Sequence, residues 1–266
     1  MGVIRTDIWL KEEFNRPANI CEKLIPFFKG EDKRDIYNQL MQFGMYRPSR
    51  ISKENLKFMV EQKVWDKVEQ LLNKYKKKWS GPDIPIFLFP LAQSQGLFTR
   101  QEGNKSGVSY PDKMFLFISP IEDINELEAL FVHEYHHVCR LRKLNQQMAN
   151  YTLLDSIIIE GLAEYAVLKN CGQKYVAKWC NLYTEKEMLT FWDKYLMNKL
   201  NKRKNERGHD ELLYGGGRIP ILLGYAAGYS IVRKFYKNHN YSTKLSFSFP
   251  AEKYLEEKNT NIKKSQ

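Results

Sequence analysis

Residues 127–141 read LEALFVHEYHHVCRL, and the order of apolar and polar side chains in this stretch has the period of an α-helix. Upstream, Asp123 is a plausible N-cap and Glu126 stands three residues later, in the capping-box position. The pattern predicts a helix from Asp123 to about Leu144. Its apolar residues surround several polar residues in the middle of the predicted helix. Histidines and carboxylates that are buried there need hydrogen-bond or metal partners.

That polar group has the form H-E-x-x-H and consists of His133, Glu134 and His137. Two helical residues four apart differ by about 40° in rotation and about 6 Å in rise, so both imidazoles can bind one metal ion. Glu134 then lies beside the metal, where a general base for metal-bound water is needed. A chance match of three fixed positions is the alternative, since the chain has five histidines. His136 points elsewhere and is expected to be a core histidine or to support a ligand.

A catalytic zinc site has three protein ligands and leaves one position for water, so a third ligand is needed. The next predicted helix, from about Leu153 to Asn170, carries Glu160 and Glu164 one turn apart on one face. Glu160 follows a continuous apolar run and is the candidate ligand, while Glu164 is placed to accept the outer N–H of a ligand histidine. The alternative is that both are surface glutamates of an amphipathic helix.

The rest of the chain predicts an α+β fold that is mainly helical. Residues 1–79 have helical periodicity, and helices are also expected at about Glu185–Asn198 and Pro220–Lys237. Short apolar runs predict two strands of a small mixed sheet between the two helical blocks, at Ile84–Phe89 and Lys113–Ile118. Gly107–Tyr110, before Pro111, is a candidate for a short edge strand. Residues 199–217 are rich in Lys, Arg, Asn and Gly and are expected to form an exposed loop.

Length and composition fit one large folded domain or two closely packed ones. Hydrophobic residues make up 43% of the 266 residues, far above the level of disordered chains. The break at Ser80-Gly81-Pro82 suggests an N-terminal helical region, residues 1–79, and a second domain, residues 80–266, although one continuous domain is also possible. No apolar run reaches the ~20 residues of a membrane helix and no secretory signal is recognisable, so a cytoplasmic protein without a membrane partner is expected.

Basic residues outnumber acidic ones, and the net charge is +11. Such charge can attract phosphates. However, the basic runs do not alternate with aromatic residues and belong to no recognisable nucleic-acid-binding module. Nucleic-acid binding is therefore disfavoured.

The motif H-E-x-x-H followed by E-G-L-A-E-Y at residues 160–165 resembles the gluzincin metallopeptidases. Together with G-Y-A-A-G-Y at residues 224–229, it resembles the YjaZ-like family of predicted zinc-dependent proteases. The resemblance implies a zincin-like architecture, in which the small sheet packs on the active-site helix. It also implies Zn²⁺ bound by His133, His137 and Glu160, with Glu134 as the base.

These observations predict a zinc metallohydrolase that cleaves peptide bonds in a peptide or protein substrate, with Glu134 assisting attack by zinc-bound water. A donor is also needed for the oxyanion, and Tyr225 is preferred over Tyr229 and His209 because it comes first on its helix. A zinc-binding pseudoenzyme with a regulatory or chaperone-like role is the main alternative.

Overall fold

The computed structural model describes residues 2–92 and 105–255 and forms two compact units, Met1–Val138 and Cys139–Gln266. The boundary between the units falls inside helix α7 (Asn125–Leu144). Besides the first part of α7, the first unit contains five α-helices and three strands among its described residues: α1 (Thr6–Glu13), α2 (Pro17–Glu22), α3 (Lys33–Gln42), α4 (Arg50–Glu61), α5 (Val64–Trp79), β1 (Ile86–Pro90), β2 (Lys105–Ser109) and β3 (Met114–Ile118).

The three strands form one mixed sheet with the order β1-β3-β2. β1 runs parallel to β3, and β2 runs antiparallel to it. Every residue of β1 and β3 is buried, which explains why both strands are continuous apolar runs, whereas β2 is half-buried throughout. The prediction of a mainly helical α+β fold with a small mixed sheet is confirmed.

The N-terminal residues complete the outer edge of β1. The backbone N–H of Ile4 donates to the carbonyl of Ile86, and the N–H of Ile86 donates to the carbonyl of Gly2. The Thr6 hydroxyl then donates to the carbonyl of Leu88, 2.5 Å away. These bonds satisfy backbone groups that an edge strand would otherwise expose.

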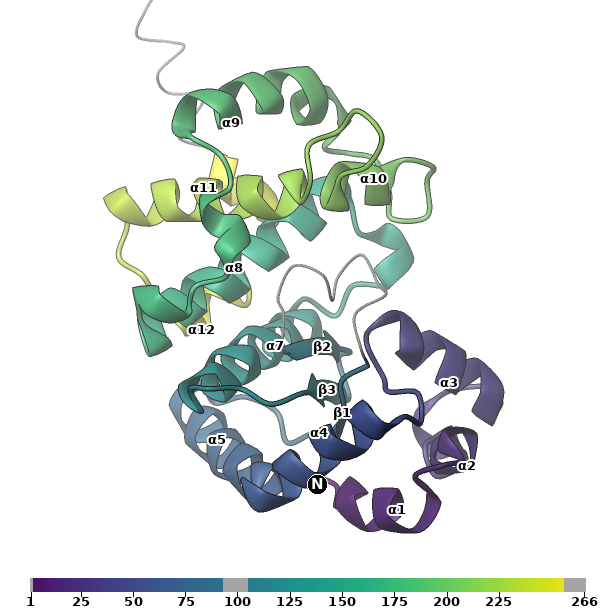
Figure 1. Ribbon diagram of the computed structural model, residues 1–266. Helices are drawn as coiled ribbons and strands as arrows, with labels where there is room; N and C mark the ends of the chain where they lie inside the picture. Colours follow the sequence, from purple (N-terminus) through teal and green to yellow (C-terminus); the bar gives the residue numbers. More distant parts are fainter. Residues whose placement is uncertain (1, 93–104, 256–266) are drawn as a thin grey trace, which may run out of the picture. The chain divides into compact units, whose positions relative to one another are not determined.

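Helix α7 lies beside α5, as Figure 1 shows, and aromatic rings join the two helices. The ring centroids of Tyr75 and Phe131 are 5.9 Å apart, and Trp79 stacks on Tyr135 at the same centroid distance, 5.9 Å. His136 is fully buried and meets the Trp79 ring edge to face at 6.2 Å. Its burial agrees with the expected place in the core, and a role in supporting a ligand stays a prediction.

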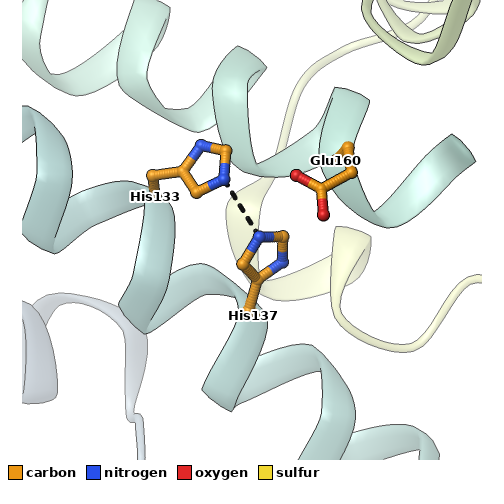
Figure 2. A group of neighbouring side chains, drawn as sticks. All are labelled: His133, His137 and Glu160. Atoms are coloured by element: carbon orange, nitrogen blue, oxygen red, sulfur yellow. Dashed lines mark hydrogen bonds between the residues drawn. The ribbon is translucent and has the colours of Figure 1, made fainter. Parts of the chain in front are cut away.

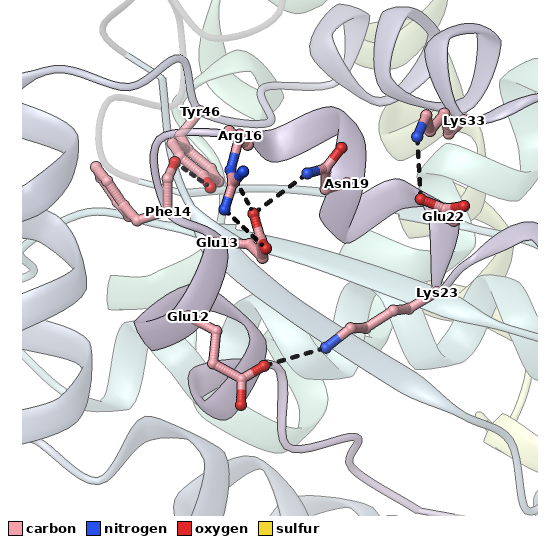
Figure 3. Close-up of polar contacts among 9 residues, drawn as sticks. All are labelled: Glu12, Glu13, Phe14, Arg16, Asn19, Glu22, Lys23, Lys33 and Tyr46. Atoms are coloured by element: carbon pink, nitrogen blue, oxygen red, sulfur yellow. Dashed lines mark hydrogen bonds and ion pairs between the residues drawn. The ribbon is translucent and has the colours of Figure 1, made fainter.

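Polar contacts on the surface of the first unit link α1, α2 and α3 (Figure 3). Lys23 pairs with Glu12 at 3.3 Å and Lys33 with Glu22 at 3.0 Å. Such exposed pairs contribute only ~0–1 kcal/mol each. The buried Tyr46 does more to fix the chain, because its hydroxyl donates to the carbonyl of Phe14, 3.0 Å away.

Besides the end of α7, the second unit has five α-helices among its described residues: α8 (Leu153–Cys171), α9 (Glu185–Phe191), α10 (His209–Tyr214), α11 (Leu223–Asn238) and α12 (Thr243–Ser246). Helix α8 begins with a capping box between Thr152 and Asp155 and ends at Gly172, whose φ is +96°. Almost every residue of α8 up to Val167 is buried, so it is the central helix of this unit.

Helix α11 crosses α8 at a pair of glycines. A β-carbon on Gly161 would lie 2.2 Å from the carbonyl carbon of Gly228, and a β-carbon on Gly228 would lie 2.0 Å from the carbonyl oxygen of Ile157. The two backbones therefore touch. This contact fixes α8, which carries Glu160, against α11, which carries Tyr225.

The prediction of an exposed loop over residues 199–217 was wrong in part. This segment contains α10, in which His209, Leu212 and Leu213 are buried. Gly208 and Gly215 bound the helix with positive φ angles, and the two leucines join the core with Trp192. Two buried leucines thus hold a short helix in a stretch whose composition is otherwise typical of a loop.

A second difference follows α9, which ends at Phe191 and is continued by a π-helical turn, Trp192–Leu196, and a 3₁₀ turn, Met197–Lys199.

Candidate metal centre

His133 and His137 lie one turn apart on α7, and their rings converge. Their Nε2 atoms are 3.0 Å apart, and the ring planes are nearly perpendicular, at 86°. Figure 2 shows both side chains projecting from the same side of the helix. The ring of His133 is half-buried, and that of His137 is only 8% exposed, so both imidazoles are partly shielded from water.

The spacing of the two rings suits a zinc ion. Two nitrogens that each bind zinc at about 2.05 Å with a tetrahedral angle are about 3.3 Å apart. The distance between the Nε2 atoms of His133 and His137, 3.0 Å, is close to this value. Imidazole nitrogens together with one carboxylate are also a donor set that zinc accepts in catalytic sites.

Glu160 supplies the carboxylate. It is half-buried on α8, in the second unit. One ligand atom from each of His133, His137 and Glu160 lies within 4.8 Å of the others, and this is the group of possible metal ligands that the described part of the chain contains. Figure 2 shows the Glu160 carboxylate directed toward the two rings. These are the three residues that the sequence analysis named as candidate ligands, and their binding of a metal stays a prediction.

Glu134 lies outside this group and packs on strand β2. Its side chain is 7% exposed, and its Oε2 accepts a hydrogen bond from the Ser109 hydroxyl, 2.6 Å away. The same hydroxyl is 2.9 Å from the backbone carbonyl oxygen of Glu134. Glu134 is thus next to the candidate ligand His133 in sequence, but its carboxylate is held by strand β2.

Glu164 is buried, with an exposure of 3%, and one of its carboxylate oxygens accepts a hydrogen bond from the backbone N–H of Ala177, 2.5 Å away. Glu164 therefore also has a structural task, since it binds the segment that follows α8. The support of a ligand histidine by Glu164 stays a prediction.

Tyr225 and Tyr229 lie on one face of α11, where both rings meet Trp179 edge to face at 5.2 Å and 6.5 Å. Tyr225 is half-buried. Tyr229 is 2% exposed, and burial raises its pKa to about 12. Its hydroxyl has no hydrogen-bond partner among the described residues. Of the two phenols, that of Tyr225 is the more accessible.

Tyr214 was missed by the sequence analysis. It ends α10, and its hydroxyl forms a hydrogen bond with Tyr225. Burial and, after it, the negative charge of Glu160 raise the pKa of Tyr214, so this phenol lies within electrostatic reach of the candidate ligand. No signal in the sequence pointed to it, because it lies in the segment expected to be a loop.

His209 has no exposed surface, and both of its ring nitrogens have neighbours. Nε2 is 3.1 Å from the Ser156 hydroxyl, and Nδ1 is 2.9 Å from Oδ1 of Asp210. The ring therefore fixes the start of α10 against α8. It leaves no free N–H for a substrate.

None of the helices in the part of the chain that the structure describes has the length and apolar character required to cross a bilayer.

Comparison with known proteins places the chain in a family. It is 34% identical over 259 residues to "Uncharacterized protein YjaZ" of Bacillus subtilis (strain 168), an alignment that covers 96% of this chain and 99% of that protein. It is 21% identical over 144 residues to "Uncharacterized protein YjfC" of the same organism, which covers 49% of this chain and 46% of that protein. No solved structure matches the chain. The family profile described as "Predicted Zn-dependent protease (DUF2268)" matches residues 64–256, which include all the residues of the candidate metal centre, and the chain belongs to this family.

Proposed function

We propose that the protein is a zinc-dependent peptidase. The observation that supports this most is the convergence of His133, His137 and Glu160 in a chain of the predicted Zn-dependent protease family. These three side chains would hold one zinc ion. When bound, zinc acts as a Lewis acid that polarises the scissile carbonyl and lowers the pKa of water.

Glu134 is the proposed general base. Its carboxylate would accept a proton from the attacking water and deliver it to the nitrogen of the leaving amine. Its position supports this role, because it follows a ligand directly in sequence yet lies outside the ligand group. The low exposure of the carboxylate also limits competition from bulk water.

Tyr225 is the proposed donor to the oxyanion that forms during attack. Its hydroxyl is paired with Tyr214, whose own hydroxyl is within electrostatic reach of Glu160. The hydroxyl of Tyr225 is thus linked to the phenol of Tyr214, which is influenced by the charge of Glu160. Tyr225→Phe should lower kcat by about a hundred- to a thousandfold, the usual cost of deleting one such donor. Glu164 is proposed to support a ligand in addition to holding Ala177.

The test uses full-length protein loaded with zinc and incubated with an unfolded protein and a peptide library, with new termini identified by mass spectrometry. Wild type should cleave, and Glu134→Gln should keep its zinc and lose cleavage. Glu126→Gln on the same helix is the matched control, because Glu126 pairs with Lys105 instead of lying beside the ligands. Zinc binding without any cleavage by wild type would contradict the proposal and favour a regulatory or chaperone-like role.

A further inference from the structure

Glu134 is packed against two residues of the edge strand β2. The Ser109 hydroxyl shares its one proton between the Glu134 carboxylate, 2.6 Å away, and the Glu134 backbone carbonyl, 2.9 Å away. A β-carbon on Gly107 would lie 2.5 Å from Cγ and 2.7 Å from Oε1 of Glu134, so the side chain rests on the bare backbone of this glycine. The strand therefore limits both the position and the rotation of the carboxylate.

The alternation of a strand explains why these two residues act together. Successive side chains of a strand point to opposite faces, so positions 107 and 109 share one face and positions 106 and 108 the other. Ser106 accordingly binds elsewhere, and its hydroxyl donates to the carbonyl of Phe43, 2.8 Å away. One strand thus carries two serines with partly buried hydrogen bonds, and only Ser109 reaches Glu134.

We propose that Ser109 is a positioning residue that holds the base Glu134 in one rotamer, with Gly107 providing the space for it. The inference rests on the proposed peptidase function. One hydroxyl that bonds both the carboxylate and the carbonyl of the same residue ties the end of a flexible side chain to its own backbone. Oε2 is engaged by this bond, which leaves Oε1 to take and deliver the proton. A base fixed in this way loses less side-chain entropy when the reaction begins.

The first test is kinetic and compares two serines of one strand. Ser109→Ala should lower kcat by about ten- to a hundredfold, because a reacting group displaced by about 1 Å costs up to that factor. KM and the zinc content should stay within about twofold of wild type, since the substrate and metal contacts remain. Ser106→Ala is the matched control and should leave kcat unchanged. Ser109→Thr keeps the hydroxyl and should restore most of the activity.

The variant Gly107→Ala tests the same contact, between Glu134 and β2, by a change on the strand. The added methyl group has no room beside Cγ of Glu134, so the carboxylate must move. This variant should lower kcat as Ser109→Ala does, with zinc retained. A normal kcat in Ser109→Ala would overturn the proposal, and so would an equal loss in Ser106→Ala.

The second test does not depend on activity. In a double-mutant cycle on the full chain, Ser109→Ala should change the unfolding equilibrium constant by about tenfold in the presence of Glu134, as expected for a hydrogen bond to a charged group. In the Glu134→Ala background the change should be several-fold smaller, because only the bond to the backbone carbonyl remains. Equal changes in both backgrounds would show that Ser109 does not hold the carboxylate. If wild type cleaves nothing, the peptidase proposal fails while this cycle still decides whether the contact exists.

Discussion

His133, Glu134 and His137 are proposed to have different roles, and their different directions on one helix support this proposal. The two histidines are separated by about 40° and face the same side, whereas Glu134 is turned by about 100° from His133. That turn brings its carboxylate to Ser109 on β2 instead of into the ligand group. One helical turn can therefore supply two ligands and a base without competition for the same ion.

The two glutamates of α8, Glu160 and Glu164, lead to a prediction about single residues. Glu160→Ala should abolish tight zinc binding, because it removes one of three ligands. Glu164→Ala should lower zinc affinity by only about ten- to a hundredfold, as for the loss of a supporting partner. It should also cost about 1–3 kcal/mol of stability, because the partly buried N–H of Ala177 loses its acceptor.

Zinc titration and urea unfolding of the two variants separate these effects. Equal zinc retention in both would show that Glu160 has been given the wrong task. A stable Glu164→Ala protein would show that its bond to Ala177 contributes little.

The candidate ligands could be predicted from the sequence because their spacing carries the geometry. His133 and His137 are four apart on one helix, and Glu160 stands out as a carboxylate within an apolar run. Ser109 and Tyr214 could not be predicted in this way. Each reaches the site from a segment distant in sequence, and a single serine or tyrosine has no pattern that marks its partner.

The crossing of α8 and α11 shows how small residues allow the backbones of two helices to pack in contact. Gly161 follows the candidate ligand Glu160 directly, and its missing side chain lets the backbone of Gly228 approach. The resemblance in sequence covered both glycine-bearing motifs, but their contact with each other becomes visible only in the structure. Helix α10 was missed for a related reason, because two leucines are too short a pattern to predict a helix without their packing partners.

Gly161→Ala should therefore lower the free energy of unfolding by about 1–3 kcal/mol, since the new methyl group has no room and forces the two helices apart. The gain in helix propensity, ~1 kcal/mol, offsets only part of this cost. Ser230→Ala, on an exposed position of α11, is the control and should stay within about 0.5 kcal/mol of wild type. Urea unfolding compares the two. A Gly161→Ala protein as stable as wild type would rule out the tight crossing.

At the scale of the molecule, the N-terminal helices are part of the packing around the sheet. Residues 2–4 pair with β1, and the Asn55 side chain donates to the carbonyl of Leu91. The rings of Tyr75 and Trp79 cover α7. The division at residue 80 stays a prediction, because the apolar periodicity of residues 1–79 indicates helices without showing what they pack against.

Removal of residues 1–79 should therefore abolish cooperative folding of the rest of the first unit, residues 80–138. It would expose the outer edge of β1 and the aromatic face of α7, at a cost that exceeds the 5–15 kcal/mol of stability typical of a whole protein. Circular dichroism during thermal unfolding should show that residues 80–266 keep only the transition of the second unit, residues 139–266. A shortened chain that also keeps a transition of residues 80–138 and binds zinc would instead establish residue 80 as a true domain boundary.

The central claim, a zinc site built by His133, His137 and Glu160, is tested most directly by elemental analysis of protein purified without chelator. Wild type should contain about one zinc per chain, and His133→Ala and His137→Ala should each lose it, because each removes a ligand. His239→Ala is the control, since this exposed ring stacks on Phe235 in another part of the fold, and it should keep its zinc. Wild-type protein without metal, or zinc retained equally in all three variants, would contradict the account.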